Sequence, residues 1–207
     1  MSQQVARKLY YSSNLNPRVA VAVARHLNSP VEYIRFDPMG RDKDWVRPLN
    51  PNTRAPLLVE GDESLWETDA IALRLSQLSG ADFWPLDRLP EVMRWVSWSA
   101  HHFTRAADVL YFERIIVPQF IPRPPDEAAI ANATDEFLEF GRVLDDTLAG
   151  RDWLVDDRLS YADFRVASAL PFAERAQLPL ADFPNIRDWH ERLNQLDAWR
   201  TPFEGLA

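Results

Sequence analysis

Hydrophobic positions in the first 80 residues follow two different spacings. Val19, Val23 and Leu27 recur every four residues, which predicts a helix over residues 17–27, and residues 68–78 have a similar helical spacing. Short apolar or aromatic runs around these two segments are typical of strands. The expected order is strand, helix, strand, helix, strand, strand and helix, over residues 8–11, 17–27, 31–36, 42–49, 56–59, 64–66 and 68–78.

The rest of the chain has no convincing strand pattern after residue 90. Residues 81–90 contain two prolines and little periodicity, so we expect a linker there. Expected helices cover residues 91–117, 126–148, 160–176 (kinked at Pro171) and 185–196, with the prolines of 118–125 ending the first of them. The sequence therefore predicts an α/β domain over residues 1–80 and an all-helical domain over residues 91–207.

Charge is distributed unevenly over these two parts. Residues 1–80 carry 10 Lys and Arg against 9 Asp and Glu, whereas residues 81–207 carry 13 against 22, and the chain has a net charge of −8. Nucleic-acid binding needs a basic surface, so we expect no nucleic-acid partner. No run of about 18 apolar residues occurs, so we expect no membrane-spanning helix and no membrane partner.

The chain contains no cysteine. Disulfides, cysteine zinc sites and a thiol nucleophile from the protein are therefore excluded. The lack of cysteine fits a reducing compartment. Residues 1–8 are polar and lack the apolar part of a secretory signal, so we expect a cytoplasmic location. His101 and His102 are adjacent and point about 100° apart on a helix, so we expect no metal site.

Four segments, spread in order over nearly the whole chain, resemble the motifs of one protein family. They are NPNTRAPLL at 50–58, ETDAI at 67–71, SYADF at 160–164 and FPNIRDW at 183–189. Together they resemble the cytosolic glutathione S-transferase family, of the bacterial type. The resemblance implies a thioredoxin-like N-terminal domain followed by a helical-bundle C-terminal domain, and within SYADF a structural capping box of Ser160 and Asp163.

The resemblance also implies glutathione as co-substrate and assigns residues to it. Pro56 is expected to follow a cis peptide bond, with the backbone of Ala55 turned toward the cysteinyl part of glutathione. Glu67 would bind the ammonium group of the γ-glutamyl end, and Thr68, at the start of a helix, its carboxylate. Arg54 stands where the family usually has lysine, and its head group either meets a carboxylate or lies at the surface.

The thiol of glutathione must lose its proton to react, and a helix N-terminus favours the thiolate. The helix expected to begin at Pro17, with Asn16 as its N-cap, directly follows the first strand. A hydroxyl or amide in the turn before it would hydrogen-bond the thiolate, and our order of preference is Ser13, Asn14 and Ser12. The alternative is that these residues form only a polar turn.

Two functions fit these expectations. The first is a glutathione transferase that adds the thiolate to an apolar electrophile. The second is a non-catalytic protein-interaction module, because some proteins of this fold serve protein contacts. A cysteine-dependent thiol transferase is excluded, since the chain has no cysteine. We also expect a homodimer built from helices 68–78 and 91–117, because the longer helix carries more aromatic surface than one small bundle needs to bury, and large apolar patches mark interfaces. The resemblance implies that the first two helices after residue 80 contribute to a dimer interface.

Overall fold

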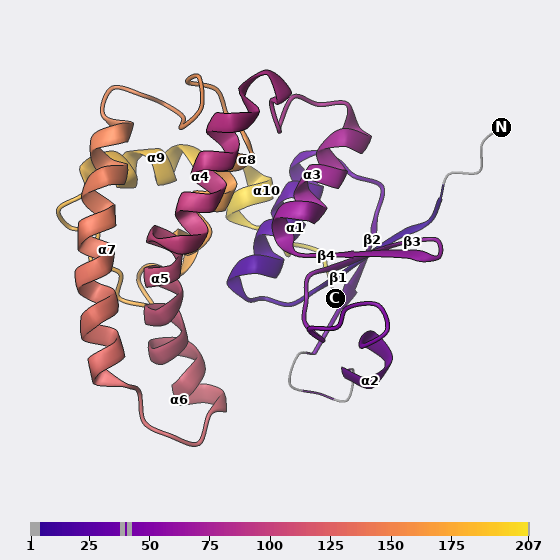
Figure 1. Ribbon diagram of the computed structural model, residues 1–207, viewed down its shortest axis with the longest axis horizontal. Coiled ribbons are helices and arrows are strands. Elements are labelled where there is room, and N and C mark those ends of the chain that lie inside the picture. The colour runs from indigo at the N-terminus through magenta and orange to yellow at the C-terminus, as the bar shows by residue number, and fades with distance from the viewer. Residues whose placement is uncertain (1–4, 38–39, 41–42, 207) are drawn as a thin grey trace. The chain divides into compact units, whose positions relative to one another are not determined.

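The computed structural model describes residues 5–37, 40 and 43–206 (Figure 1). The chain forms two compact units, which we describe separately. The first joins the residues up to Asp82 to those from Leu196 onward, and the second is Phe83–Gln195. The C-terminal segment differs from the expected division, in which it belongs to the helical domain, because it packs on a helix of the first unit.

The first unit contains a four-stranded sheet with the strand order β2-β1-β3-β4. Strand β1 pairs in parallel with β2 and antiparallel with β3, and β3 pairs antiparallel with β4. A parallel pair needs a crossover connection, which helix α1 supplies. The elements are β1 (Arg7–Tyr11), α1 (Leu15–His26), β2 (Glu32–Arg35), α2 (Lys43–Val46), β3 (Leu57–Glu60), β4 (Glu63–Trp66) and α3 (Thr68–Ser79).

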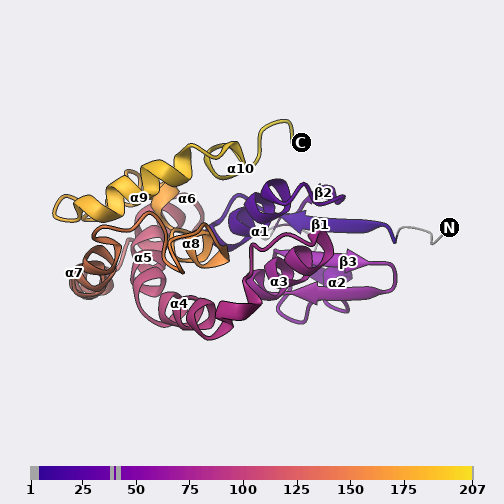
Figure 2. The same ribbon diagram turned by 90° about the horizontal axis from the view of Figure 1, so that it is seen from above.

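This order confirms the predicted order of seven elements and the thioredoxin-like fold class. The expected start of the second helix, at residue 42, lies outside the described residues. Side chains alternate across β1 as expected for a strand. Tyr10 packs with the buried cluster of Phe36, Val46 and Leu57, whereas Tyr11 is buried on the opposite face. Helices α1 and α3 contact each other, as Figure 2 shows.

The second unit is helical, as predicted, and all of its residues are described. Residues 83–195 contain no strand apart from an isolated bridge between Val155 and Arg158. Its α-helices are α4 (Leu89–His101), α5 (Phe103–Tyr111), α6 (Val117–Phe120), α7 (Glu127–Leu148), α8 (Tyr161–Val166) and α9 (Pro184–Asn194). Helix α10 (Asp197–Arg200) follows and belongs to the first unit. Asp126 caps α7 by accepting hydrogen bonds from two first-turn amides, each 3.0 Å long.

The prediction of one continuous helix over 91–117 is wrong. The backbone leaves helical geometry at His102, with φ −128° and ψ −94°, and the hydroxyls of Ser99 and Thr104 pair across the break.

Helical structure also continues past Pro118. The preceding residues Phe112–Ile116 form a π-helical turn, in which the Val117 amide bonds to the Phe112 carbonyl five residues back. Pro118 then lies in the first turn of α6, where a missing amide is tolerated.

The prediction of a kinked helix over 160–176 is also wrong. Helix α8 ends at Val166, and a 3-10 turn, Leu170–Phe172, follows after a non-helical stretch. A proline inside a helix clashes with the carbonyl four residues earlier, which for Pro171 is that of Ala167. Ala167 is the C-terminal cap of α8, so the helix ends where that clash would begin.

The capping box at the start of α8 is present, as predicted. The Asp163 carboxylate accepts hydrogen bonds from the Ser160 amide at 2.9 Å and from the Leu154 amide and the Trp189 indole at 3.0 Å each. Burial raises the pKa of Asp163 to about 6, against the opposing effect of these donors. One buried carboxylate thus joins α8, α9 and the loop before α8.

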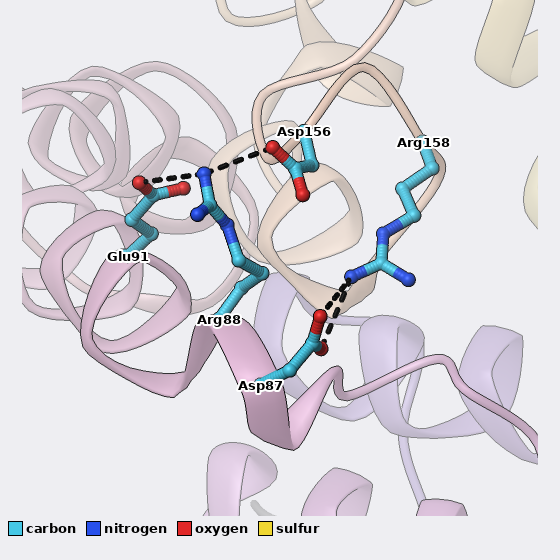
Figure 3. Close-up of polar contacts among 5 residues, drawn as sticks. All are labelled: Asp87, Arg88, Glu91, Asp156 and Arg158. Carbon is cyan, nitrogen blue, oxygen red and sulfur yellow. Dashed lines mark hydrogen bonds and ion pairs between the residues drawn. The ribbon is translucent and has the colours of Figure 1, made fainter.

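Ion pairs connect the 3-10 turn Leu86–Arg88, directly before α4, to the loop that contains Asp156 and Arg158 (Figure 3). Arg88 contacts Glu91 at 3.0 Å and Asp156 at 2.8 Å, and Arg158 contacts Asp87 at 3.1 Å. These side chains are exposed or half-buried, so each pair contributes at most about 1 kcal/mol. None of the helices in the described part of the chain has the length and apolar character needed to cross a membrane.

Candidate glutathione site

The strand register brings three of the expected site segments to the same end of the sheet, where β1 and β4 end and β3 begins. Leu57, the first residue of β3, pairs with Tyr10 of β1 on one side and with Trp66 of β4 on the other. The turn after β1, the loop before β3 and the residue after β4 therefore start from neighbouring positions. Those segments carry residues 12–14, residues 54–56 and residues 67–68.

The turn after β1 is shorter than expected. Helix α1 begins at Leu15 with Asn14 in the N-cap position, so the prediction of Asn16 as N-cap and Pro17 as first helical residue is wrong by two residues. Pro17 is the third helical residue, and a proline is tolerated there because first-turn amides have no intrahelical partner. The amide of Arg18 bonds to the Asn14 carbonyl at 2.9 Å.

The three candidate donors differ in accessibility. Ser13 and Asn14 are exposed, directly before the first turn of α1, whereas Ser12 is buried. A thiolate can approach an exposed hydroxyl or amide without rearrangement of the turn. Accessibility thus distinguishes Ser12 from the other two candidates and does not rank Ser13 against Asn14.

The loop before β3 is organised by one buried amide side chain. Asn50 donates from Nδ2 to the Arg54 carbonyl at 2.8 Å and accepts at Oδ1 from the Asn52 amide at 2.9 Å. Its carbonyl accepts from the Thr53 amide at 2.9 Å, where the backbone turns through a positive φ of 50°. Sequence reasoning assigned Asn50 no role, although an asparagine before a proline in a polar loop is a signal for such a turn.

The peptide bond between Ala55 and Pro56 is cis, which confirms the prediction. Pro56 is buried, Ala55 is half-buried and Arg54 is exposed. The Arg54 head group thus lies at the surface of the same loop, and the structure shows no carboxylate of the described residues in an ion pair with it.

The start of α3 is joined to the start of α1. Thr68 is buried, and its hydroxyl donates to the Asn16 carbonyl oxygen at 3.2 Å. Glu67 precedes it with φ 73° and ψ 129°, and its side chain is exposed. Two helix N-termini therefore lie beside each other at this end of the sheet. Helix N-termini favour anionic groups. The residues that the structure describes contain no group of side chains suited to a metal ion.

Two family models match the chain. The model of the glutathione S-transferase N-terminal domain matches residues 10–82, and the model of the C-terminal domain matches residues 109–197. The chain belongs to the glutathione S-transferase family. This confirms the family that the four sequence motifs indicate.

Relatives within the glutathione S-transferase family agree with this assignment over nearly the whole length. Glutathione S-transferase 2 of Schizosaccharomyces pombe is 28% identical over 223 residues, which cover 93% of this chain and 92% of the relative. Glutathione transferase F7 from Populus trichocarpa has the same fold, with a TM-score of 0.87 at 18% identity over 98% of this chain and 100% of that one. A glutathione S-transferase-I solved with lactoylglutathione bound has a TM-score of 0.84 at 19% identity, over 95% and 98% of the two chains.

Proposed function

We propose that this protein binds glutathione at the end of the sheet described above and transfers the glutathione thiolate to an apolar electrophile. The observation that carries the proposal is the pairing of Leu57 with both Tyr10 and Trp66, which brings the three expected binding segments together. Family membership supports the same activity.

Each part of glutathione has a candidate partner in these segments. The backbone of Ala55, before Pro56, would pair with the cysteinyl residue. Glu67 would bind the ammonium group of the γ-glutamyl end, and the first-turn amides of α3, beginning at Thr68, its carboxylate. Arg54, exposed on the neighbouring loop, would meet the remaining carboxylate.

The chemistry requires the ionised thiol. A free thiol has a pKa of about 8.5, and each unit by which the site lowers it corresponds to about 1.4 kcal/mol of preferential binding of the thiolate. The N-terminus of α1 and a donor from Ser13 would supply this preference. The thiolate sulfur then forms a bond to the electrophilic carbon, and a leaving anion such as halide departs with the electron pair of the bond that breaks.

We further propose that the protein acts as a cytoplasmic homodimer. The absence of cysteine fits the reducing cytoplasm. Large apolar side chains are exposed on α3 and α4, which overlap the two segments expected to form the interface, with Leu78 on α3 39% exposed and Leu89 and Met93 on α4 37% and 46% exposed. Light scattering at micromolar concentration should give twice the mass of one chain, and the mass of a single chain would contradict the dimer.

The activity is tested in two steps on the whole protein. The protein should be retained on immobilised glutathione and released by free glutathione, and it should then form conjugates with a panel of apolar halides and epoxides. The ultraviolet absorbance of the thiolate should show that bound glutathione ionises at lower pH than free glutathione. Retention without conjugation, and with an unshifted thiol, would favour the protein-interaction module instead.

A further inference from the structure

The C-terminal segment, residues 196–206, packs on α1 within the first unit (Figure 2). Arg18 and Arg25 lie seven residues apart and therefore on the same side of α1. The Arg18 guanidinium donates to the Trp199 carbonyl oxygen and lies 4.7 Å from the centre of the Trp199 ring. Arg25 donates to the Glu204 carbonyl oxygen. Two points of the C-terminal segment are thus bound to two positions on α1, one in its first turn and one in its last.

The same segment covers the end of β1. The Phe203 ring stacks on Tyr11, with ring centres 5.6 Å apart and 17° between the planes. Tyr11 is the last residue of β1 and directly precedes Ser12. The C-terminal segment therefore contacts the chain on both sides of residues 12–14, through Phe203 before them and through Trp199 after them.

The buried charge of Arg18 depends on its contact with Trp199. It is 5% exposed, its Nη1 atom has no hydrogen-bond partner, and no carboxylate of the described residues forms an ion pair with it. Burial lowers its pKa to about 10, so it is still charged at neutral pH. The carbonyl and ring of Trp199 are its partners, and a buried cation without partners is costly. The position of the C-terminal segment and that of the first turns of α1 are therefore coupled.

We propose that the C-terminal segment holds residues 12–14 in the geometry that the thiolate needs, with Phe203 and Trp199 as positioning residues that do not touch glutathione. The inference rests on the proposed function. Glutathione affinity is expected to depend on Ala55, Glu67 and Thr68, which lie on other segments. A shift of the turn should therefore reduce the rate far more than the affinity, since small displacements of a reacting group lower rates strongly.

The experiment compares three variants of the whole protein. Phe203→Ala removes the stacking ring, and Phe203→Tyr retains it. Thr201→Ala is the matched control, because its hydroxyl bonds to Asp197 and Glu204 inside the C-terminal segment and not to α1. The measurements are kcat, KM for glutathione, the thiol pKa of bound glutathione, and hydrogen exchange of the amides of residues 12–16 and 18 in the free protein.

For Phe203→Ala we expect kcat to fall about tenfold, with KM for glutathione within about twofold of the wild-type value. The pKa of the bound thiol should rise toward that of free glutathione, and the amides of residues 12–16 and 18 should exchange faster. Phe203→Tyr should restore all four quantities, and Thr201→Ala should leave them unchanged. If Phe203→Ala does not fold, Phe203→Leu replaces it, since it keeps an apolar side chain without a stacking ring.

Wild-type kcat, thiol pKa and amide exchange in Phe203→Ala would overturn the inference and leave the proposed function intact. A failure of the proposed function is recognised separately, in the wild-type protein. A bound thiol that titrates like free glutathione there would contradict the proposed function. Amide exchange is measured without glutathione, so in that case it still tests whether the C-terminal segment positions residues 12–14. Unchanged exchange in Phe203→Ala would overturn that role as well.

Discussion

The Thr68 hydroxyl donates to the Asn16 carbonyl oxygen, and this hydrogen bond joins the first turns of α3 and α1. A hydroxyl has one proton, so in this conformation Thr68 has none to donate to a ligand. The part of glutathione that binds at the start of α3 would therefore meet backbone amides, while the Thr68 side chain keeps the two helix N-termini together.

Thr68→Val should weaken glutathione binding more than it lowers turnover. The substitution leaves the Asn16 carbonyl without its buried donor, which costs about 1 kcal/mol or more, and it loosens the contact between α1 and α3. We expect the dissociation constant for glutathione, measured by calorimetry, to rise about fivefold to tenfold. Thr68→Ser keeps the hydroxyl and is the control, so equal binding by the two variants would show that the hydrogen bond has no part in the site.

Asn50→Ala should also reduce glutathione affinity, although we expect Asn50 itself to make no contact with glutathione. Its side chain holds the backbone of Asn52 and Arg54, and the loop continues directly into Ala55. Losing both hydrogen bonds removes about 1 kcal/mol for each and frees the loop, so we expect about a tenfold weaker complex by calorimetry.

Two further variants separate the contributions within this loop. Asn50→Asp keeps an acceptor for the Asn52 amide but loses the donor to the Arg54 carbonyl, so its affinity should lie between those of wild type and Asn50→Ala. Asn52→Ala changes only an exposed side chain and should bind like wild type. Wild-type affinity in Asn50→Ala would contradict an organising role for this residue.

Much of the fold could be predicted because its causes are local. Residue spacing and turn residues predicted the seven elements from β1 to α3, and the cap of α7 at Asp126 is a signal within the sequence itself. The break at His102 has causes that residue spacing does not report. It is accompanied by the Ser99–Thr104 pair and by stacking of Trp98 on Phe103, and such contacts exist only in the folded chain.

The candidate site was predictable to a similar extent. Motif resemblance pointed to Pro56, Glu67 and Thr68, and it anticipated the cis bond before Pro56. It could not identify which of two nearby asparagines occupies the N-cap position of α1, because Asn14 and Asn16 are equally suited to that position. Nor could it foresee that the C-terminal segment packs on α1, since that contact joins residues about 180 positions apart.

The thiolate donor is the residue that mutation can identify most directly. Ser13→Ala should lower kcat about 100-fold, as loss of one donor to a developing or stabilised anion commonly does. Asn14→Ala should have a much smaller effect. Neither change should alter glutathione affinity greatly, because that affinity is expected to rest on the loop before β3 and the start of α3.

Ultraviolet titration of bound glutathione checks this assignment. The pKa of the thiol should be highest in the variant that lacks the true donor, and the pH at which kcat/KM for the electrophile, measured at saturating glutathione, reaches half its maximum should rise with it. If Asn14→Ala shows the larger shift, the donor is Asn14 and the order of preference is wrong. If neither variant differs from wild type, the thiolate depends on the amides of α1 or on Ser12.

The buried Asp163 makes a prediction about stability and pH. Its pKa is raised from 3.8 to about 6 by burial, so the folded protein binds more protons than the unfolded protein between these two values. Stability then decreases as pH rises through this window, because the free energy of unfolding falls wherever the native state holds more protons. The shift corresponds to a contribution of about 3 kcal/mol, present below pH 4 and lost above pH 6.

Denaturant unfolding of wild type and Asp163→Asn at pH 4, 5, 6 and 7 tests this contribution. The variant should be less stable at every pH, because an amide nitrogen cannot accept the Ser160 hydrogen bond that caps α8. Its stability deficit should nevertheless shrink from pH 4 to pH 6, since only the wild type carries the carboxyl that must ionise in a buried position. Other titrating groups affect both proteins equally and cancel in the difference. A deficit that stays constant over this range would show that the Asp163 pKa is not raised by folding, and a deficit that grows would show that its hydrogen bonds outweigh the cost of burial.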